Sequence, residues 1–200
     1  MTTLFPETIE TDRLRLELAD PESVDIEELY GVYSGDALES AFRYVLITPF
    51  ETAYDPLSFL ESARENHQDG SSAIYIIRPR ESEDGADELA GTTTLFVDWD
   101  CRRAELAIAL VPRFWGRGYS GERAEALLEV AFERLDLEVV VVSCHPDNEQ
   151  SRRAIERYVD RFGGQYDGRI RNARVLDDEP IDLRRYTIDR EQYAGAGVAA

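Results

Sequence analysis

Hydrophobic and polar positions along this chain predict strands and helices in a mixed order. Near the N-terminus, Leu14, Leu16 and Leu18 alternate with charged residues, which is the period-two pattern of a half-buried strand. At 139–142, consecutive valines form the short β-branched run that is typical of a strand buried on both faces. By the same criteria, further strands are predicted at 73–77, 89–97, 104–111, 165–175 and 181–189.

Helices are predicted where apolar residues recur at the 3.6-residue period. The segment 120–135 shows this pattern most clearly, with an apolar face made of Ala124, Leu127, Leu128, Ala131 and Leu135. Further helices are predicted at 56–66, at 149–161 and, as one or two pieces, at 21–46. The acidic stretch 80–87 is interpreted as a solvated hairpin loop.

The order of these elements predicts an α/β (α+β) fold with a mixed, mostly antiparallel sheet of about six to seven strands and about four to five flanking helices. The segment 104–142 is predicted to form a strand, a loop, a helix and a parallel strand, which is a crossover connection. No repeat or linker divides the chain. We therefore expect a single domain over residues 1–193 and a flexible small-residue tail at 194–200.

The composition is that of a protein that folds without disulfide bonds or a structural metal. With 200 residues, 43% of them hydrophobic, it can bury a core without a disulfide or a metal. Cys101 and Cys144 form no C-x-x-C pair and do not cluster with His67 or His145, so no metal site is predicted and a reducing compartment is expected. No basic-then-apolar leader and no membrane-length apolar run occurs, which predicts a cytoplasmic protein.

The charge balance is strongly acidic. Asp and Glu number 41 against 22 basic residues, the formal net charge is -19 at pH 7, and every basic residue is Arg. This composition is similar to that of proteins from halophilic, salt-accumulating microbes, because self-repulsion is costly unless salt screens it, and the Debye length falls to about 3 Å at about 1 M salt. We expect neither nucleic acid nor a membrane as a partner, and an acidic surface favours cationic substrates.

The stretch from Arg113 to Glu122 departs from this acidic background. Between the predicted strand and the predicted helix it holds Gly116, Gly118 and Gly121, together with two arginines and no acid before Glu122. Glycines let an anion approach the backbone, and the first turn of a helix offers unpaired N–H groups and a dipole that favours negative charge. The stretch therefore predicts a phosphate-binding loop.

One ligand that fits the glycine spacing is a dinucleotide. The loop satisfies G-x-G-x-x-G, the pattern of a Rossmann oxidoreductase. That fold places the pattern in the first βαβ unit and an acid at the end of the next strand. Here antiparallel elements come first and the strand ends in Ser143 and Cys144, so a dinucleotide enzyme remains a remote alternative.

The same residues, read as R-x-x-G-x-G, resemble the acyl-CoA pyrophosphate loop of the Gcn5-related N-acetyltransferase (GNAT) superfamily. Other motifs are similar to its RimJ/RimL-type branch, over about residues 10–190. These motifs are Thr11-Asp12-Arg13-Leu14-Arg15-Leu16, the strand 104–110, Asn148-x-x-Ser151, and Asp182 with Tyr186. The resemblance implies an acyltransferase, an N-acetyltransferase that uses acetyl-CoA as cosubstrate and no metal.

The resemblance also implies roles for individual residues. In this superfamily a backbone N–H of the strand before the loop stabilises the oxyanion, and the loop holds the pyrophosphate. Carried over to this chain, the cofactor contacts fall on Ala109, Leu110, Val111, Arg113, Gly116, Arg117, Gly118, Tyr119, Ser120, Gly121 and Asn148. Some members carry a further catalytic Glu in the later sheet; the nearest positions here are Asn172 and Arg174, so that base is missing.

Three side chains are candidates for the chemistry, and each has a structural alternative. Glu105 is the candidate general base, or the polar member of an alternating strand. Ser151 is the candidate donor to the leaving thiolate, with Tyr158 as a substitute, or a surface serine of a helix. Asn148 is a cofactor contact, a helix N-cap, or both. The resemblance implies direct transfer without a covalent enzyme intermediate. Cys144 and His145 are strand neighbours that point to opposite faces, so we do not expect them to form a nucleophilic pair.

No motif defines the acceptor. A protein N-terminal α-amine, such as that of a ribosomal protein, and a small amine are the two candidates. The segments expected to shape its pocket, 32–62 and 176–181, are the least motif-like in the chain. An acyl-CoA-binding regulatory module without transfer activity is the alternative function, and the chain is expected to be a monomer or a homodimer.

Overall fold

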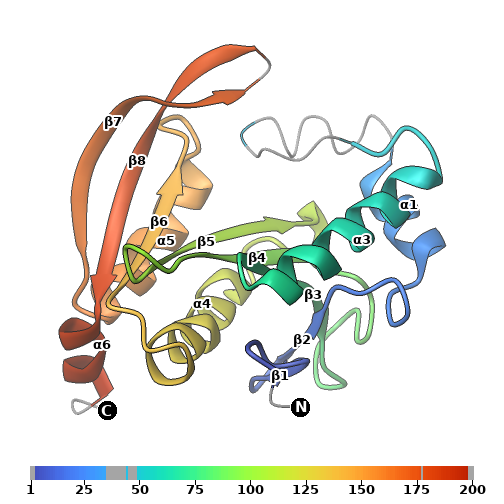
Figure 1. Cartoon of the computed structure of the whole chain (residues 1–200), viewed down its shortest axis with the longest axis horizontal. Coiled ribbons are helices and arrows are strands. Elements are labelled where there is room, and N and C mark those ends of the chain that lie inside the picture. The colour runs from blue at the N-terminus through green and yellow to red at the C-terminus, as the bar shows by residue number, and fades with distance from the viewer. Residues whose placement is uncertain (1–2, 35–43, 45–48, 177, 198–200) are drawn as a thin grey trace. The chain divides into compact units, whose positions relative to one another are not determined.

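The structure is a computed structural model that describes residues 3–34, 44, 49–176 and 178–197. The chain divides into two compact units, Met1–Phe96 with Ile108–Tyr119, and Val97–Ala107 with Ser120–Ala200. The elements in chain order (Figure 1) are β1 (Thr8–Glu10), β2 (Leu14–Leu18), α1 (Ile26–Tyr33), α3 (Tyr54–Asp69), β3 (Ser72–Pro79), β4 (Gly91–Asp98), β5 (Arg103–Leu110), α4 (Tyr119–Glu129), β6 (Val139–Cys144), α5 (Glu149–Arg161), β7 (Gln165–Leu176), β8 (Glu179–Asp189) and α6 (Arg190–Gly197).

In the first unit, β1, β2, β3 and β4 are antiparallel neighbours in that order. The leucines of β2 are buried while Arg15 and Glu17 between them are only partly buried, so the predicted alternation is confirmed. The predicted loop at 80–87 is confirmed as a connection between β3 and β4. The short edge strand β1 was not predicted, and with it the described residues form eight strands rather than six or seven.

Helices α1 and α3 build the core of the first unit on this sheet. Leu29 and Tyr33 of α1 and Leu60 of α3 are buried together with Ile76 of β3. The predicted helix at 56–66 is confirmed and longer at both ends, and Gly70 caps it in the left-handed conformation with φ of 81°. Of the helices predicted at 21–46, α1 confirms 26–33, while 21–25 form a turn that ends in the N-cap Asp25; 35–43 and 45–48 lie outside the described residues.

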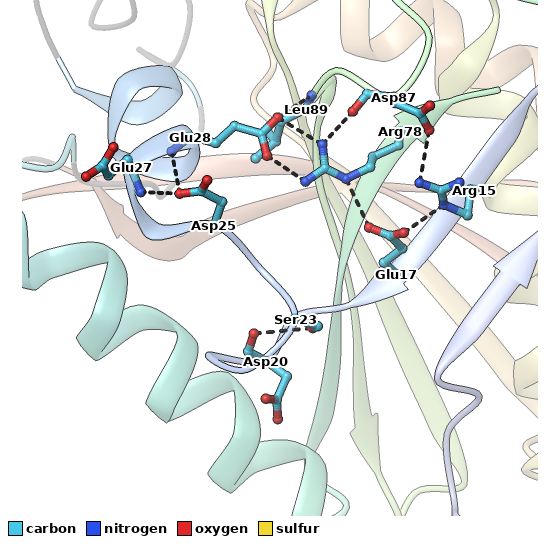
Figure 2. Close-up of polar contacts among 10 residues, drawn as sticks. All are labelled: Arg15, Glu17, Asp20, Ser23, Asp25, Glu27, Glu28, Arg78, Asp87 and Leu89. Atoms are coloured by element: carbon cyan, nitrogen blue, oxygen red, sulfur yellow. Dashed lines mark hydrogen bonds and ion pairs between the residues drawn. The ribbon is translucent and has the colours of Figure 1, made fainter. Parts of the chain in front are cut away.

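An ion-pair network joins α1 to this sheet (Figure 2). The nearly buried Arg78 of β3 donates to both carboxylate oxygens of Glu28 in α1, at 2.9 and 2.6 Å, and its Nε donates to Glu17 at 2.9 Å. Asp87 accepts from Arg78 through its carbonyl oxygen at 2.6 Å and from Arg15 through its carboxylate at 3.0 Å. The network therefore fixes α1 against β2 and β3.

In the second unit the strand order is β5, β6, β8 and β7. The β5–β6 pair is parallel, with a register from Arg103 and Val139 to Leu106 and Val142, while β8 is antiparallel to both β6 and β7. The predicted parallel crossover and the mixed, mostly antiparallel sheet are thus confirmed. Helix α4 continues as a π-helical turn, Val130–Arg134, and the whole predicted apolar face is buried.

Helices α5 and α6 complete the second unit. Helix α5 packs against β6 and β8, with Ile155, Tyr158 and Val159 buried (Figure 1). Helix α6 was not predicted, and it reaches into the segment 194–200 that was expected to be a flexible tail. Tyr193 of α6 lies between Phe132 and Phe162, with ring centroids 5.0 and 5.7 Å away. No helix of the described residues is long and apolar enough to cross a membrane.

Candidate active site

The loop between β5 and α4 is built on a pair of buried aromatic residues. A short 3₁₀ turn, Pro112–Phe114, follows β5, and Trp115 and the glycines lead into α4. Phe114 and Tyr119 are 2% and 1% exposed, and their rings stack with centroids 6.4 Å apart. The Tyr119 hydroxyl donates to Glu83 at 2.7 Å, so both ends of the loop are anchored within the first unit.

The glycines give this loop a shape that other residues would strain. Gly116 and Gly118 have φ of 77° and 85°, a region that only glycine adopts without cost. A Cβ added at Gly116 or Gly121 would meet no atom within 4 Å, and one at Gly118 would meet only the Arg13 guanidinium, 3.3 Å away. The open space beside the glycines and the first turn of α4 suits a phosphate group.

The arginines of the loop contact acidic residues of the β3–β4 connection. Arg113 pairs with Glu88, and Arg117 pairs with Asp84 at 3.0 Å and donates to its carbonyl oxygen at 2.7 Å. Arg13 donates to the carbonyl oxygen of Arg117 at 2.9 Å. The basic stretch seen in the sequence is therefore balanced by carboxylates, and Arg113 and Arg117 can bind a phosphate only by giving up part of these contacts.

Backbone groups at the end of β5 are already partly engaged. The Val111 N–H donates to the carbonyl oxygen of Ala90 at 2.9 Å, and the carbonyl oxygen of Leu110 accepts from the Trp115 indole at 2.7 Å. Val111 was expected to be one of the backbone donors. With its N–H committed, that expectation rests on Ala109 and Leu110.

In the second unit, Glu105 of β5 faces a guanidinium. Its Oε1 lies 2.8 Å from Nη2 of Arg174 in β7, and its Oε2 makes no hydrogen bond with any residue that the structure describes. From the resemblance, position 174 was notable only as a place where a catalytic carboxylate is missing. The structure shows that the residue there contacts the candidate base directly.

The start of α5 holds the other two candidates. Asn148 caps the helix, because its side-chain oxygen accepts from the Ser151 N–H at 3.0 Å, so the structural alternative for Asn148 is confirmed. Ser151 is half-buried, and its hydroxyl makes no hydrogen bond within the described part of the chain. A hydroxyl in this condition can donate to an incoming group.

Tyr158 is part of the core. It is 3% exposed, and burial raises the pKa of its hydroxyl to about 12. The neighbouring Arg123 is 1% exposed, and burial lowers the pKa of this guanidinium. Neither the Tyr158 hydroxyl nor Nε and Nη1 of Arg123 has a hydrogen-bond partner among the described residues. Of the two candidate proton donors, Ser151 is therefore the more accessible.

Cys144 lacks the properties of a nucleophile. The residue is 6% exposed, and burial raises the pKa of its thiol to about 11, so the thiolate is scarce near neutral pH. The adjacent His145 accepts from the Asp147 N–H at 3.1 Å and thereby stabilises the turn before α5. This agrees with the expectation that the two residues form no catalytic pair.

The candidate residues are distributed over both units. The first contains the loop up to Tyr119, and the second contains Glu105, Asn148 and Ser151. Sequence reasoning missed the acidic partners of the loop arginines and the contact of Arg174 with Glu105. Neither has a local signal, because each joins residues far apart in the chain. Among the described residues, no group of three or more His, Cys, Asp or Glu is placed to hold a metal ion.

Residues 13–158 match the family described as "Acetyltransferase (GNAT) domain", and the match includes parts of both units. The chain therefore belongs to the GNAT acetyltransferases and is an acyltransferase, which overturns the dinucleotide alternative. A curated relative, "Uncharacterized N-acetyltransferase p20" of Bacillus licheniformis, is 24% identical over 190 residues, 94% of this chain and 99% of that protein.

Solved structures agree in fold. The microcin C7 self-immunity acetyltransferase MccE, in complex with acetyl-CoA and AMP, has a TM-score of 0.77 at 20% identity, over 94% of this chain and 98% of that one. RimL, a ribosomal L7/L12 alpha-N-protein acetyltransferase in complex with coenzyme A, has a TM-score of 0.74 at 20% identity, over 92% and 98%. The mixed sheet with one parallel pair is thus the GNAT fold.

Proposed function

We propose that this chain is an acetyl-CoA-dependent N-acetyltransferase of the RimJ/RimL type that transfers acetyl directly to a primary amine. The observation that carries the proposal is the open space beside Gly116, Gly118 and Gly121 at the start of α4, in a chain that belongs to the GNAT family. The fold similarity to MccE with acetyl-CoA and to RimL with coenzyme A supports the same ligand.

The residues that hold the cosubstrate are proposed from the family resemblance, and the open space beside the glycines supports the part that concerns the loop. The pyrophosphate lies on the backbone of Gly116, Gly118, Ser120 and Gly121, where N–H groups and the helix dipole stabilise it. Arg113 and Arg117 add charge-assisted hydrogen bonds when they exchange part of their contacts with acidic residues. Further contacts come from Tyr119, from Asn148, and from the backbone of Ala109 and Leu110, which also stabilises the oxygen that becomes negative during transfer.

Acetyl-CoA supplies an activated thioester. The amine nitrogen attacks its carbonyl carbon, whose oxygen becomes negative, and the carbon–sulfur bond then breaks so that CoA leaves as a thiolate. Two residues of the chain assist these steps. Oε2 of Glu105 accepts the proton that the amine loses, directly or through a water molecule, while Arg174 holds Oε1. The hydroxyl of Ser151 donates a hydrogen bond to the sulfur as it leaves. Orientation of the two substrates contributes much of the remaining rate.

Two acceptors fit this reaction. RimL is by name an acetyltransferase of a ribosomal-protein α-amine, and the shared fold makes a protein N-terminus, such as that of a ribosomal protein, the first candidate. A small amine is the second, because no motif of the chain restricts the acceptor to a protein. We further propose that the protein works in concentrated salt, since its net charge is -19 and all its basic residues are Arg.

Release of CoA in about 2 M KCl, with a panel of N-terminal peptides and small amines, tests this proposal. Acetyl transfer predicts that at least one amine accelerates release far above hydrolysis, and that Gly118→Glu, which places a carboxylate in the loop, abolishes it. If acetyl-CoA binds tightly but no amine accelerates release, the alternative of an acyl-CoA-binding regulatory module replaces the enzyme.

A further inference from the structure

The sheet of the second unit carries a hollow on one of its faces. Ala104, Val140 and Tyr186 point to the face that α5 covers and are buried. On the opposite face a hollow of about 220 Å³ is lined by alternate residues of β5, β6 and β8 and by the bulged part of β7. Its charged lining residues are Arg103, Glu105, Arg174 and Arg185.

The hollow therefore differs in charge from the rest of the chain. Three guanidinium groups and one carboxylate line it, in a protein whose formal net charge is -19. Arg103 is paired with Asp98 at 3.1 Å, outside the lining, and Arg174 is paired with Glu105. Arg185 is the lining arginine that is least neutralised.

The guanidinium of Arg185 has an N–H donor that lacks an acceptor among the described residues. It makes no hydrogen bond within the part of the chain that the structure describes, and its buried Nε is 3.6 Å from the nearest carboxylate oxygen, on Asp167. Oδ1 of Asp167 accepts from Thr187 at 2.9 Å and from Gln165 at 3.1 Å, and the other oxygen, Oδ2, is the one that lies 3.6 Å from Arg185, too far for a hydrogen bond. A buried N–H without an acceptor is costly, so a ligand that accepts from Arg185 gains binding energy.

A bulge in β7 brings Arg174 to the same hollow. The register of β7 with β8 shifts between Ile170 and Arg174, and Asn172 within the shift has φ of 47°. Asp182 of β8 holds this conformation, because it accepts from the Asn172 N–H at 2.9 Å and from Arg169 at 2.7 Å. These hydrogen bonds lower the pKa of the Asp182 carboxyl, which therefore stays ionised.

We propose that the hollow binds an anionic group of the acceptor, so that the preferred substrate is a primary amine that carries a carboxylate. The inference rests on the proposed acetyl transfer and specifies its acceptor. The planar forks of Arg185 and Arg174 match a carboxylate, and charge-assisted bidentate pairs of this kind are strong. Glu105 lies in the same hollow, so an acceptor held by its carboxylate presents its amine near the candidate base. The acidic surface had suggested cationic acceptors, and the hollow indicates the opposite.

Acceptors that differ only in one charge test this inference. In the CoA-release assay, glutamine and asparagine, which carry an α-carboxylate, are compared with their C-terminal amides, which do not, and peptides with Glu in the second position are compared with the same peptides carrying Gln. We expect kcat/KM to be about tenfold or more higher for the anionic member of each pair. The two arms distinguish a free amino acid from an acidic N-terminus as the source of the carboxylate.

Substitutions of Arg185 test whether the hollow is the source of the preference for anionic acceptors. Arg185→Gln is expected to reduce the preference for anionic over neutral acceptors about tenfold, mainly through KM, and Arg185→Lys, which keeps the charge but loses the fork, to reduce it less. Arg161→Gln is the control, because Arg161 is an exposed arginine of α5 that pairs with Glu125 and does not line the hollow. The preference should be unchanged in this variant.

The outcomes separate the two claims. Transfer to neutral or cationic acceptors as efficient as transfer to their anionic partners overturns the inference and leaves the acetyltransferase standing. An anionic preference that Arg185→Gln and Arg185→Lys leave intact also overturns it. Absence of transfer to every acceptor overturns the proposed function and the inference with it.

Discussion

At the scale of single residues, substitution of Glu105 tests the proposed chemistry most directly. Glu105→Gln keeps the shape of the side chain and removes its capacity to accept a proton. At pH 7 we expect kcat to fall about 10²- to 10⁴-fold, as for loss of a general base. An α-amine has a pKa of about 7.7 to 8.0, so the defect should shrink above about pH 9, where the amine is already neutral.

The control for Glu105 is an equivalent change on the surface. Glu149→Gln on α5 removes only an exposed ion pair with Arg153, at 3.1 Å, and should leave the pH–rate profile unchanged. A Glu105→Gln variant with wild-type kcat at pH 7 would show that water alone accepts the proton. A defect that is the same at every pH would mean that Glu105 positions the acceptor instead.

Asp20 makes a second prediction at this scale, for stability against pH. Two hydrogen bonds from Arg64, at 2.8 and 2.6 Å, and one from the Glu22 N–H lower the pKa of the Asp20 carboxyl. A lowered folded-state pKa stabilises the protein above the unfolded value, about 3.9, and the contribution is lost as the pH falls through the folded-state pKa. Asp20→Asn should therefore be less stable at neutral pH and lose less stability on acidification.

Chemical denaturation from neutral pH down to the acid limit measures this effect. Glu61→Gln is the matched control, because this exposed residue of α3 has no ion-pair partner among the described residues. If the two variants follow the same curve, the Asp20–Arg64 pair contributes nothing that depends on pH.

At the scale of elements, the network around Arg78 is expected to hold α1 on its sheet. Glu28→Ala leaves a nearly buried guanidinium with Glu17 as its remaining carboxylate partner and removes the acceptor of the Leu89 N–H. We expect the free energy of unfolding to fall by about 1–3 kcal/mol, the usual cost of orphaning buried donors. Glu27→Ala, on the exposed face of the same helical turn, should lower the free energy of unfolding by no more than about 0.5 kcal/mol. Urea denaturation of both variants checks the difference, and equal losses would contradict a structural role for the network.

The elements also show how far sequence reasoning reaches. Strands and helices with strong periodicity, such as β2, α4 and α5, were predicted because the spacing of apolar residues along the chain defines their buried faces. The edge strand β1 is too short to show a period. Helix α6 was missed because its many small residues show no helical period, although its Tyr193 packs on Phe132 and Phe162.

The candidate site divides in the same way. The glycine loop and the Asn148 cap have local signatures and were predicted, because each depends on a few consecutive residues. The pairing of Arg174 with Glu105 depends on the bulge in β7, and the hollow depends on which strands become neighbours. Neither follows from spacing along the chain.

At the scale of the whole molecule, the net charge of -19 should make stability depend on salt. We expect the Tm to rise between about 0.2 M and about 2 M KCl as the Debye length shrinks. Glu129→Gln relieves like-charge repulsion with Glu125 and Glu133, four residues away on either side in α4 and its π-helical turn, so it should raise the Tm at low salt and not at high salt. A Tm that is flat or falls with KCl would contradict adaptation to salt.

The central claim is that the loop between β5 and α4 holds acetyl-CoA. Calorimetric titration of acetyl-CoA in about 2 M KCl tests it most directly, with Gly121→Glu as the decisive variant, because Gly121 is helical and a side chain there meets no atom within 4 Å. The account predicts a Kd between about 1 μM and 1 mM for the wild type, no binding to Gly121→Glu, and binding weakened but present for the uncharged Gly121→Gln. Gly195→Glu on α6, an exposed and equally open glycine, should bind like the wild type. Undiminished binding of acetyl-CoA to Gly121→Glu would contradict the account.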